Sequence, residues 1–290
     1  MPNTAADLAG QAAAFLERAE AILNRLEILL PAARPDTPDW NAVAFRWRRN
    51  HHHGWLEAIH KPQQIDVTHL KGVDAQRDAI ERNTARFVAG HPANNVLLTG
   101  ARGTGKSSLI KAMLARHAPA GLRMIEVDKQ HLVDLPDIIR LISERPERFI
   151  IFCDDLGFNA DDHSYMALKT ALDGSLAAPA DNLLIYATSN RRHLMPESQH
   201  DNRPDQPDDL HPGETVDEKV SLSDRFGLWL SFYAFDQDTY LACVDEWLHQ
   251  SGLPDTSHPD VRREALLWAL ARGNRSGRSA RQFAHDFASR

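Results

Sequence analysis

The sequence has little cysteine and no long apolar run. Its 290 residues include two cysteines, and Cys153 lies within the apolar stretch RFIIFC, where a thiol behaves as a small hydrophobic group. We therefore expect no structural disulfide and a reducing, cytoplasmic location. No apolar run approaches the roughly 20 residues that span a bilayer, and the first thirty residues carry acids without a basic segment. We expect neither a membrane span nor a targeting segment.

The sequence also lacks a strong excess of either charge. The net charge of −7 and the isoelectric point near 6.1 give no overall electrostatic signal for nucleic acid. These values do not demand an acidic or a basic partner. The length allows a sizeable core, either one large domain with appendages or two or three small ones.

The pattern of apolar residues predicts three regions along the chain. Residues 1–65 begin with an amphipathic helix and continue through a polar piece rich in arginine and histidine, so we expect a helical accessory region. Residues 66–235 alternate continuous apolar stretches with helical periodicity, which is typical of a parallel sheet covered on both faces. Residues 236–290 predict a small helical domain. An acidic, proline-rich stretch at 196–219 predicts a mobile loop.

One glycine-rich stretch predicts a phosphate-binding loop. GARGTGKSS matches the pattern G-x-x-x-x-G-K-[ST], with Gly100, Gly105, Lys106 and Ser107 at the fixed positions. It follows the apolar stretch NVLL and opens a helix with one apolar face, as a phosphate loop must. The backbone N–H groups and the helix N-terminus favour phosphate, Lys106 reaches the outer phosphates, and Ser107 offers a hydroxyl to Mg²⁺. A chance glycine-rich turn would not account for both flanks.

Two consecutive aspartates, Asp154 and Asp155, follow the apolar stretch FIIFC. A buried carboxylate is costly unless it is paired or binds a metal, so the doublet predicts a cation site. Enzymes with a phosphate loop hold Mg²⁺ with the loop hydroxyl and an acid at the end of another strand, which fits Asp154. The alternative for Asp154 is a turn or helix-capping role.

Three further polar features occur near the predicted strands and helices later in the chain. Asn190 ends the apolar stretch LLIYATS, where its amide could orient an attacking water, although an asparagine can also simply end a strand at a turn. Arg225 precedes the last predicted strand and could stabilise transition-state charge, or form a surface ion pair. The tail RGNRSGRSARQF predicts a helix capped by a serine, with arginines three positions apart. One of these arginines could reach the nucleotide.

Taken in order, LKGVD, GARGTGKSS, IIFCDD, ATSN, DRFG and SGRSARQF resemble the motifs of an AAA+ ATPase over residues 66–290. The resemblance is closer still to an uncharacterised bacterial AAA+ group defined as a domain of unknown function. It implies a P-loop α/β fold with a five-stranded parallel sheet flanked by helices, a C-terminal helical lid and an N-terminal helical extension. It also implies ATP and Mg²⁺ as cofactors and assembly as a homo-oligomer.

The resemblance also implies roles for individual residues. The adenine would be surrounded by Leu70, Gly72, Val73 and Asp74, and the phosphates by Gly100, Ala101, Arg102, Gly103, Thr104, Gly105, Lys106, Ser107 and Ser108. Ser107 and Asp154 would hold the metal, Asp155 would activate water, and Asn190 would be the first sensor. Arg225 would be a finger offered in trans to the next subunit. Arg281 would be the second sensor, with Arg278 as a close alternative.

Asp155 departs from the family pattern, because most AAA+ ATPases have glutamate there. A side chain shorter by one methylene has less reach toward a water, so we expect slow hydrolysis if the protein is an ATPase and negligible hydrolysis if it is a nucleotide-gated switch. We therefore keep two classes open: an oligomeric ATPase that remodels an unknown macromolecule, and a binding switch gated by ATP. The segment DKQHLVDLPD lacks the aromatic-hydrophobic-glycine loop that unfoldases carry after the second strand.

Two local patterns carry weaker alternatives. The triplet HHH at 51–53 invites a metal site, but consecutive side chains point in different directions and no cysteine is near. The stretch FRWRRNHHHGW mixes arginine with tryptophan, which suits DNA binding by an ATP-dependent loader. Packing of the tryptophans on the ATPase core is the plainer interpretation, so we expect a protein target rather than DNA.

Overall fold

The computed structural model describes residues 15–20, 37–50, 53–158, 162–173, 181–191, 194, 222–253 and 255–290. The chain divides into two units, Met1–Pro38 and Asp39–Arg290. Residues 15–20 of the first unit are helical. The remainder of the amphipathic helix expected there, and the acidic stretch 196–219, lie outside the described residues.

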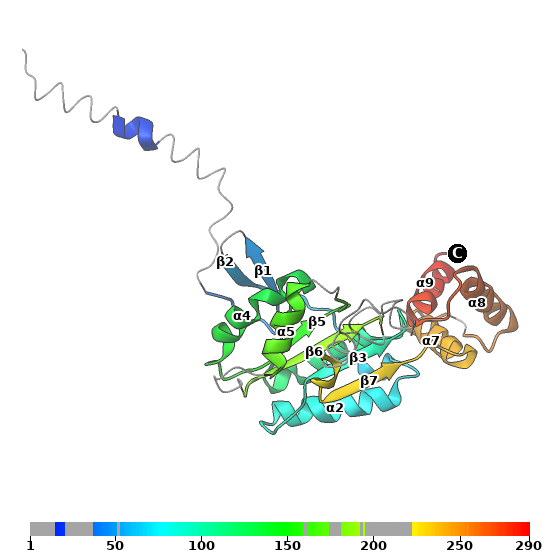
Figure 1. Cartoon of the computed structure of the whole chain (residues 1–290). Coiled ribbons are helices and arrows are strands. Elements are labelled where there is room, and N and C mark those ends of the chain that lie inside the picture. Colours follow the sequence, from blue (N-terminus) through cyan, green and yellow to red (C-terminus); the bar gives the residue numbers. More distant parts are fainter. Residues whose placement is uncertain are drawn as a thin grey trace, which may run out of the picture. The chain divides into compact units, whose positions relative to one another are not determined.

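The second unit is built on one mostly parallel sheet of seven strands (Figure 1). The strands lie in the order β2-β1-β4-β5-β6-β3-β7. Their bounds are β1 Ala44–Asn50, β2 His53–Ala58, β3 Val96–Gly100, β4 Leu122–Glu126, β5 Arg148–Cys153, β6 Leu183–Ser189 and β7 Leu228–Phe232. The five strands from β3 to β7 pair in parallel throughout, as the alternating pattern predicted. The prediction of a five-stranded sheet is wrong, because β1 and β2 extend it.

The two additional strands form a hairpin from residues that the sequence assigned to a helical region. β1 pairs in parallel with β4 and antiparallel with β2. Phe45 and Trp47 are buried on one side of β1, while Arg46 and Arg48 on the other side form ion pairs with Glu126 and Glu57. This alternation has the period of a strand, but the density of arginine and histidine concealed it.

Helices cover both faces of the sheet, which explains why its strands are apolar on both sides. The helices are α2 Asp74–Val88, α3 Lys106–His117, α4 Leu135–Ile142 and α5 His163–Asp173. α4 and α5 pack on one face through residues such as Ile138 and Leu168, and α2 and α3 pack on the other through Ile80 and Ile110. Short 3-10 helices lie at Val67–His69 (η1), Ala118–Ala120 (η2) and Lys129–Asp134 (η3).

The C-terminal residues form a helical group with a core of its own. Its helices are α7 Gln237–Gln250, α8 Pro259–Ala271 and α9 Gly277–Ala288, drawn from orange to red in Figure 1. Tyr240 of α7 is fully buried and donates from its hydroxyl to the carbonyl of Ala265 in α8 at 3.0 Å. Asp236 caps α7 and Ser276 caps α9 through their side chains. Within the described residues, no helix is long and apolar enough to cross a membrane.

Candidate nucleotide site

The glycine-rich loop connects the end of β3 to the start of α3. Gly105 has φ 97° and precedes the first helical residue, Lys106, in a left-handed conformation that favours glycine. At Gly100 a Cβ atom would lie 1.8 Å from the carbonyl oxygen of Phe232 in β7. The loop therefore needs glycine at both ends, for backbone geometry at one and for close strand approach at the other.

Lys106 is the only lysine buried to this depth among the described residues, with 6% of its surface exposed. Its ammonium group donates to the carbonyls of Gly100 and Ala101, both at 2.7 Å, and to Asn190 Oδ1 at 3.1 Å. Burial lowers the pKa of Lys106 below its ordinary value, while the charges of Asp154 and Asp155 act in the opposite direction. The cation thus lies at the carboxyl edge of the sheet, held by carbonyl and amide oxygens.

Asp154 and Ser107 lie within direct hydrogen-bonding distance. Ser107 Oγ donates to Asp154 Oδ1 at 2.5 Å, and Thr188 Oγ1 donates to the same oxygen at 2.6 Å. A hydroxyl and a carboxylate are hard oxygen ligands of the kind that Mg²⁺ prefers, and Mg²⁺ usually completes its shell with water and substrate phosphate. In the part of the chain that the structure describes, no three histidine, cysteine or carboxylate groups cluster as a metal site. His51 and His52 lie outside that part.

Asp155 adopts an uncommon backbone conformation. Its φ of 53° is the one positive value outside glycine among the described residues. Its backbone N–H donates to Thr188 Oγ1 at 2.9 Å, and its carboxylate accepts a hydrogen bond from Asn190 Nδ2. Asn190 therefore contacts both Lys106 and Asp155, and the three side chains meet as the strand ends predicted. The sequence interpretation placed Thr188 at the end of its strand without giving it a role.

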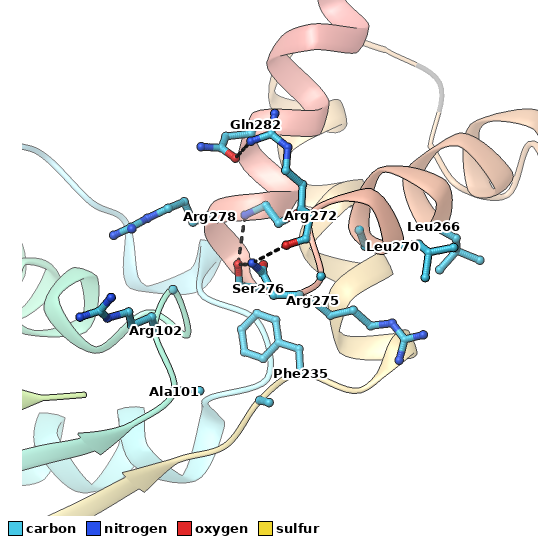
Figure 2. A pocket seen from close by; sticks show the side chains of 16 residues that line it. Ala101, Arg102, Phe235, Leu266, Leu270, Arg272, Arg275, Ser276, Arg278 and Gln282 are labelled. Carbon is cyan, nitrogen blue, oxygen red and sulfur yellow. Dashed lines mark hydrogen bonds between the residues drawn. The ribbon is translucent and has the colours of Figure 1, made fainter. Parts of the chain in front are cut away.

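A cavity of about 720 Å³ lies between the phosphate loop and the C-terminal helices (Figure 2). It is lined by Ala101, Arg102, Gly103, Ala234, Phe235, Leu266, Ala269, Leu270, Arg272, Gly273, Asn274, Arg275, Ser276, Arg278, Ser279 and Gln282. The N-terminus of α9 contacts the loop directly, because the Gly277 N–H donates to the Gly103 carbonyl at 2.9 Å. A cavity that joins a phosphate loop, a helix N-terminus and arginines is suited to an anionic ligand.

The structure separates the two arginines considered for the second sensor. Arg278 lines this cavity, whereas the Arg281 guanidinium lies 5.0 Å from the ring centroid of Trp247 in α7. Ser276 caps α9, so Arg278 falls in its first turn beside the loop, and Arg281 falls one turn further along. The cap residue in the sequence was the signal that could have favoured Arg278.

A second, smaller cavity of about 190 Å³ adjoins the predicted adenine segment. It is lined by Gly72, Val73, Gln76, Phe232, Tyr233, Ala234, Phe235, Asp236 and Thr239, and it shares Ala234 and Phe235 with the larger cavity. Leu70 packs instead against the sheet core, and Asp74 pairs with Arg77 at 2.8 Å. Gly72 and Val73 are thus the two predicted adenine neighbours that line this cavity.

The segment before α2 is joined to the C-terminal helices by an ion pair. Lys71 Nζ lies 2.8 Å from Glu246 Oε2 of α7, and His69 Nε2 lies 3.6 Å from the other carboxylate oxygen. At Gly72 a Cβ atom would lie 2.3 Å from Thr239 Cγ2 of the same helix. The segment 69–72, which leads into the smaller cavity, therefore lies against α7.

The remaining predicted arginines have acidic partners. The guanidinium of Arg225 pairs with Asp173 at the end of α5, and this side chain is not among the cavity-lining residues. Arg46, Arg48 and Arg49, considered for DNA, pair with Glu126, Glu57 and Asp134. An arginine paired with a carboxylate binds phosphate less well, so these three ion pairs weigh against DNA as the ligand of the described part of the hairpin.

Comparison with known proteins agrees with this architecture. Residues 40–290 match a family described as protein of unknown function, DUF815. No curated protein matches the chain in sequence. The FIGL-1 AAA domain in complex with ADP is similar with a TM-score of 0.51 and 17% identity, over 79% of this chain and 74% of that chain. The Orc1 protein of Aeropyrum pernix in complex with DNA gives 0.50 and 16%, over 73% of this chain but only 58% of the Orc1 chain. These likenesses show the α/β fold of the AAA+ proteins.

Proposed function

Because the chain belongs to the DUF815 family and has an AAA+ fold, we propose that it is a Mg²⁺-dependent ATPase. The observation that carries the proposal is the convergence of a phosphate loop, two carboxylates and an amide at one edge of the sheet. Lys106, Asp155 and Asn190 are joined by hydrogen bonds there, although they come from three separate segments. The FIGL-1 AAA domain, which is similar in fold, is in complex with ADP, and this supports an adenine nucleotide as the ligand of the site.

In this proposal the loop from Gly100 to Ser108 cradles the phosphates, with Lys106 on the outer ones. Ser107 and Asp154 would hold Mg²⁺, which supplies charge neutralisation of the phosphate oxygens. Asp155 accepts a proton from the attacking water, and Asn190 orients that water through its amide. The hydrogen bonds among these side chains in the structure support this division of roles.

The two cavities, which share Ala234 and Phe235 in their linings, support a position for the nucleotide. The base lies in the smaller cavity against Gly72 and Val73, and the phosphates lie at the loop beside the N-terminus of α9. Arg278 replaces Arg281 as the second sensor in this proposal, because Arg278 lines the cavity. Phe235 lines both cavities and would contact the nucleotide where base and phosphates are joined.

We further propose that the protein works as a homo-oligomer in which Arg225 serves the nucleotide of the next subunit. In this arrangement residues 236–290 act as a lid on the nucleotide domain, residues 66–235. The N-terminal region, residues 1–65, contacts a macromolecular target, a protein rather than DNA. The acidic partners of Arg46, Arg48 and Arg49 support that preference.

The test is release of phosphate from ATP by the purified protein in the presence of Mg²⁺. Lys106→Ala should abolish turnover and weaken nucleotide binding by at least tenfold, since it removes a charge-assisted contact to phosphate. Lys111→Ala on the same helix α3 is the matched control and should behave as the wild type. If both variants hydrolyse ATP as the wild type does, Lys106 does not hold the phosphates.

One observation favours a second candidate, a nucleotide-gated switch with negligible hydrolysis. Asp155 is shorter than the usual glutamate, and its carboxylate is engaged by Asn190. Tight binding of ATP without phosphate release by the assembled protein would favour the switch. Phosphate release per subunit that rises with protein concentration would favour the oligomeric ATPase.

A further inference from the structure

Thr188 makes hydrogen bonds to the three consecutive residues that follow β5. It is the penultimate residue of β6, 2% exposed, and β6 pairs with β5 in parallel. Its hydroxyl donates to Asp154 Oδ1 at 2.6 Å and accepts from the Asp155 N–H at 2.9 Å. Its backbone carbonyl accepts from the Leu156 N–H at 2.7 Å. One threonine thus fixes both the metal-directed acid and the main chain that carries the next acid.

The main chain at Asp155 needs such support. A left-handed φ of 53° brings Cβ close to the backbone carbonyl and is unfavourable for most residues. Aspartate and asparagine tolerate it better than residues with longer side chains, because their short polar groups can bond locally. The two hydrogen bonds from residues 155 and 156 to Thr188 supply the interactions that hold this turn.

The backbone conformation at Asp155 decides where its carboxylate lies. From the left-handed conformation the short Asp155 side chain reaches Asn190, which also accepts from Lys106 of the phosphate loop. A glutamate would have to adopt a conformation that it tolerates less well, and would carry its carboxylate beyond Asn190. The backbone conformation and the shorter acid are therefore matched to each other.

We propose that Thr188 is a positioning residue for ATP hydrolysis, whose hydroxyl holds Asp155 in the left-handed turn that makes aspartate the effective acid in this site. The inference rests on the proposed ATPase function and deepens it. It explains the aspartate at position 155, where most AAA+ ATPases have glutamate, by the left-handed backbone conformation there. Thr188 touches neither nucleotide nor water in this role; it acts through Asp154 and Asp155.

Kinetics of four variants test the role. Thr188→Val keeps the shape of the side chain but removes both hydrogen bonds, so kcat should fall by tenfold or more while the dissociation constant for ADP changes less than threefold. Thr188→Ser keeps the hydroxyl and should restore most of the turnover. Thr99→Val is the matched control, because Thr99 is equally buried on β3 and bonds to Trp229 instead. Asp155→Glu should lower kcat rather than raise it.

Amide hydrogen exchange tests the geometry without any hydrolysis. The Asp155 N–H should exchange at least tenfold faster in the Thr188→Val protein than in the wild type or the Thr188→Ser protein. Equal exchange in all three proteins would overturn the hydrogen bond. A gain of activity in Asp155→Glu, or an unchanged kcat in Thr188→Val, would overturn the matching of acid and backbone.

The two levels of the proposal fail in different ways. A wild-type protein that releases no phosphate overturns the ATPase function and the catalytic role of Thr188 together, while the exchange rates still report whether the turn is held. A wild-type protein that hydrolyses ATP, with a Thr188→Val variant equally active, overturns the inference alone.

Discussion

Lys106 at the start of α3 donates a hydrogen bond to Asn190 Oδ1 at the end of β6, 3.1 Å away and 84 positions later in the chain. The amide nitrogen of the same Asn190 donates to Asp155. The asparagine thus contacts both the lysine proposed to bind phosphate and the acid proposed to activate water. Replacement of this one side chain should separate binding of nucleotide from its turnover.

We expect Asn190→Ala to retain ADP affinity within about threefold and to lose turnover by about a hundredfold, since a water that is not oriented loses its proton transfer to Asp155, and a positioned proton transfer contributes about that much or more. Equilibrium binding of a fluorescent nucleotide and steady-state phosphate release measure the two effects. An equal loss of both would mean that Asn190 supports the loop rather than the water.

Arg278 and Arg281 should differ although they lie one turn apart on α9. Arg278→Ala removes a cavity-lining cation and should weaken ADP binding by tenfold or more, as expected for a charge-assisted hydrogen bond of about 1.5–3 kcal/mol. Arg281→Ala removes a contact with Trp247 and should leave binding unchanged while lowering the melting temperature slightly. Calorimetric titration and thermal melting of both proteins make the comparison. The reverse result would restore Arg281 as the second sensor.

Arg225 pairs with Asp173 within its own chain, so the pair must open before the guanidinium can serve a neighbour. Arg225→Ala should bind ADP normally and lose the rise of specific activity with protein concentration. Asp173→Asn frees the guanidinium and should keep that rise or begin it at lower concentration. Phosphate release measured across a dilution series, with sizing in parallel, tests both. An Asp173→Asn protein as inactive as Arg225→Ala would identify the pair as purely structural.

The ion pair between Lys71 and Glu246 predicts a pH-dependent attachment of α7. Burial alone would raise the pKa of Glu246, but hydrogen bonds from Lys71 and Gln250 and nearby positive charges outweigh it and hold this pKa below 4.5. Since the folded pKa is the lower one, the pair stabilises the folded protein fully above the unfolded pKa and loses its effect as pH falls through the folded pKa.

Glu246→Gln should therefore lower the melting temperature at neutral pH, by the equivalent of about 1 kcal/mol, and the difference from the wild type should disappear in acid. Glu144→Gln, at an exposed position, is the control and should have little effect at any pH. A difference that stays constant across the acid range would show that the charge of Glu246 does not contribute.

The site was predictable to the extent that its chemistry is carried by local patterns. An apolar stretch followed by polar residues marks each part of the site in the sequence. These parts are the loop before α3, the acids after β5 and the amide after β6. Parallel strands then bring these ends to one edge of the sheet. Thr188 could not be predicted in this way, because threonine is common in strands. Its role depends on the pairing of β6 with β5, which no local sequence pattern contains.

The fold was harder to predict where a strand alternates buried apolar side chains with charged ones. In β1 the buried Phe45 and Trp47 alternate with arginines that pair with acids from other segments. Polarity suggested an accessory segment, whereas the acidic partners that allow the strand to join the sheet come from β4 and β2. Long-range charge pairing cannot be read from the composition of one segment.

The indole of Trp47 has a consequence for how the molecule opens. Its Nε1 donates to Asp134 at 2.9 Å, Arg49 pairs with the same carboxylate, and Asp134 is 6% exposed at the end of η3. Asp134 belongs to η3 and both of its partners belong to the hairpin, so detaching either element would break the two contacts at once. The hairpin and the stretch after β4 should therefore unfold as one cooperative unit and resist proteolytic nicking together.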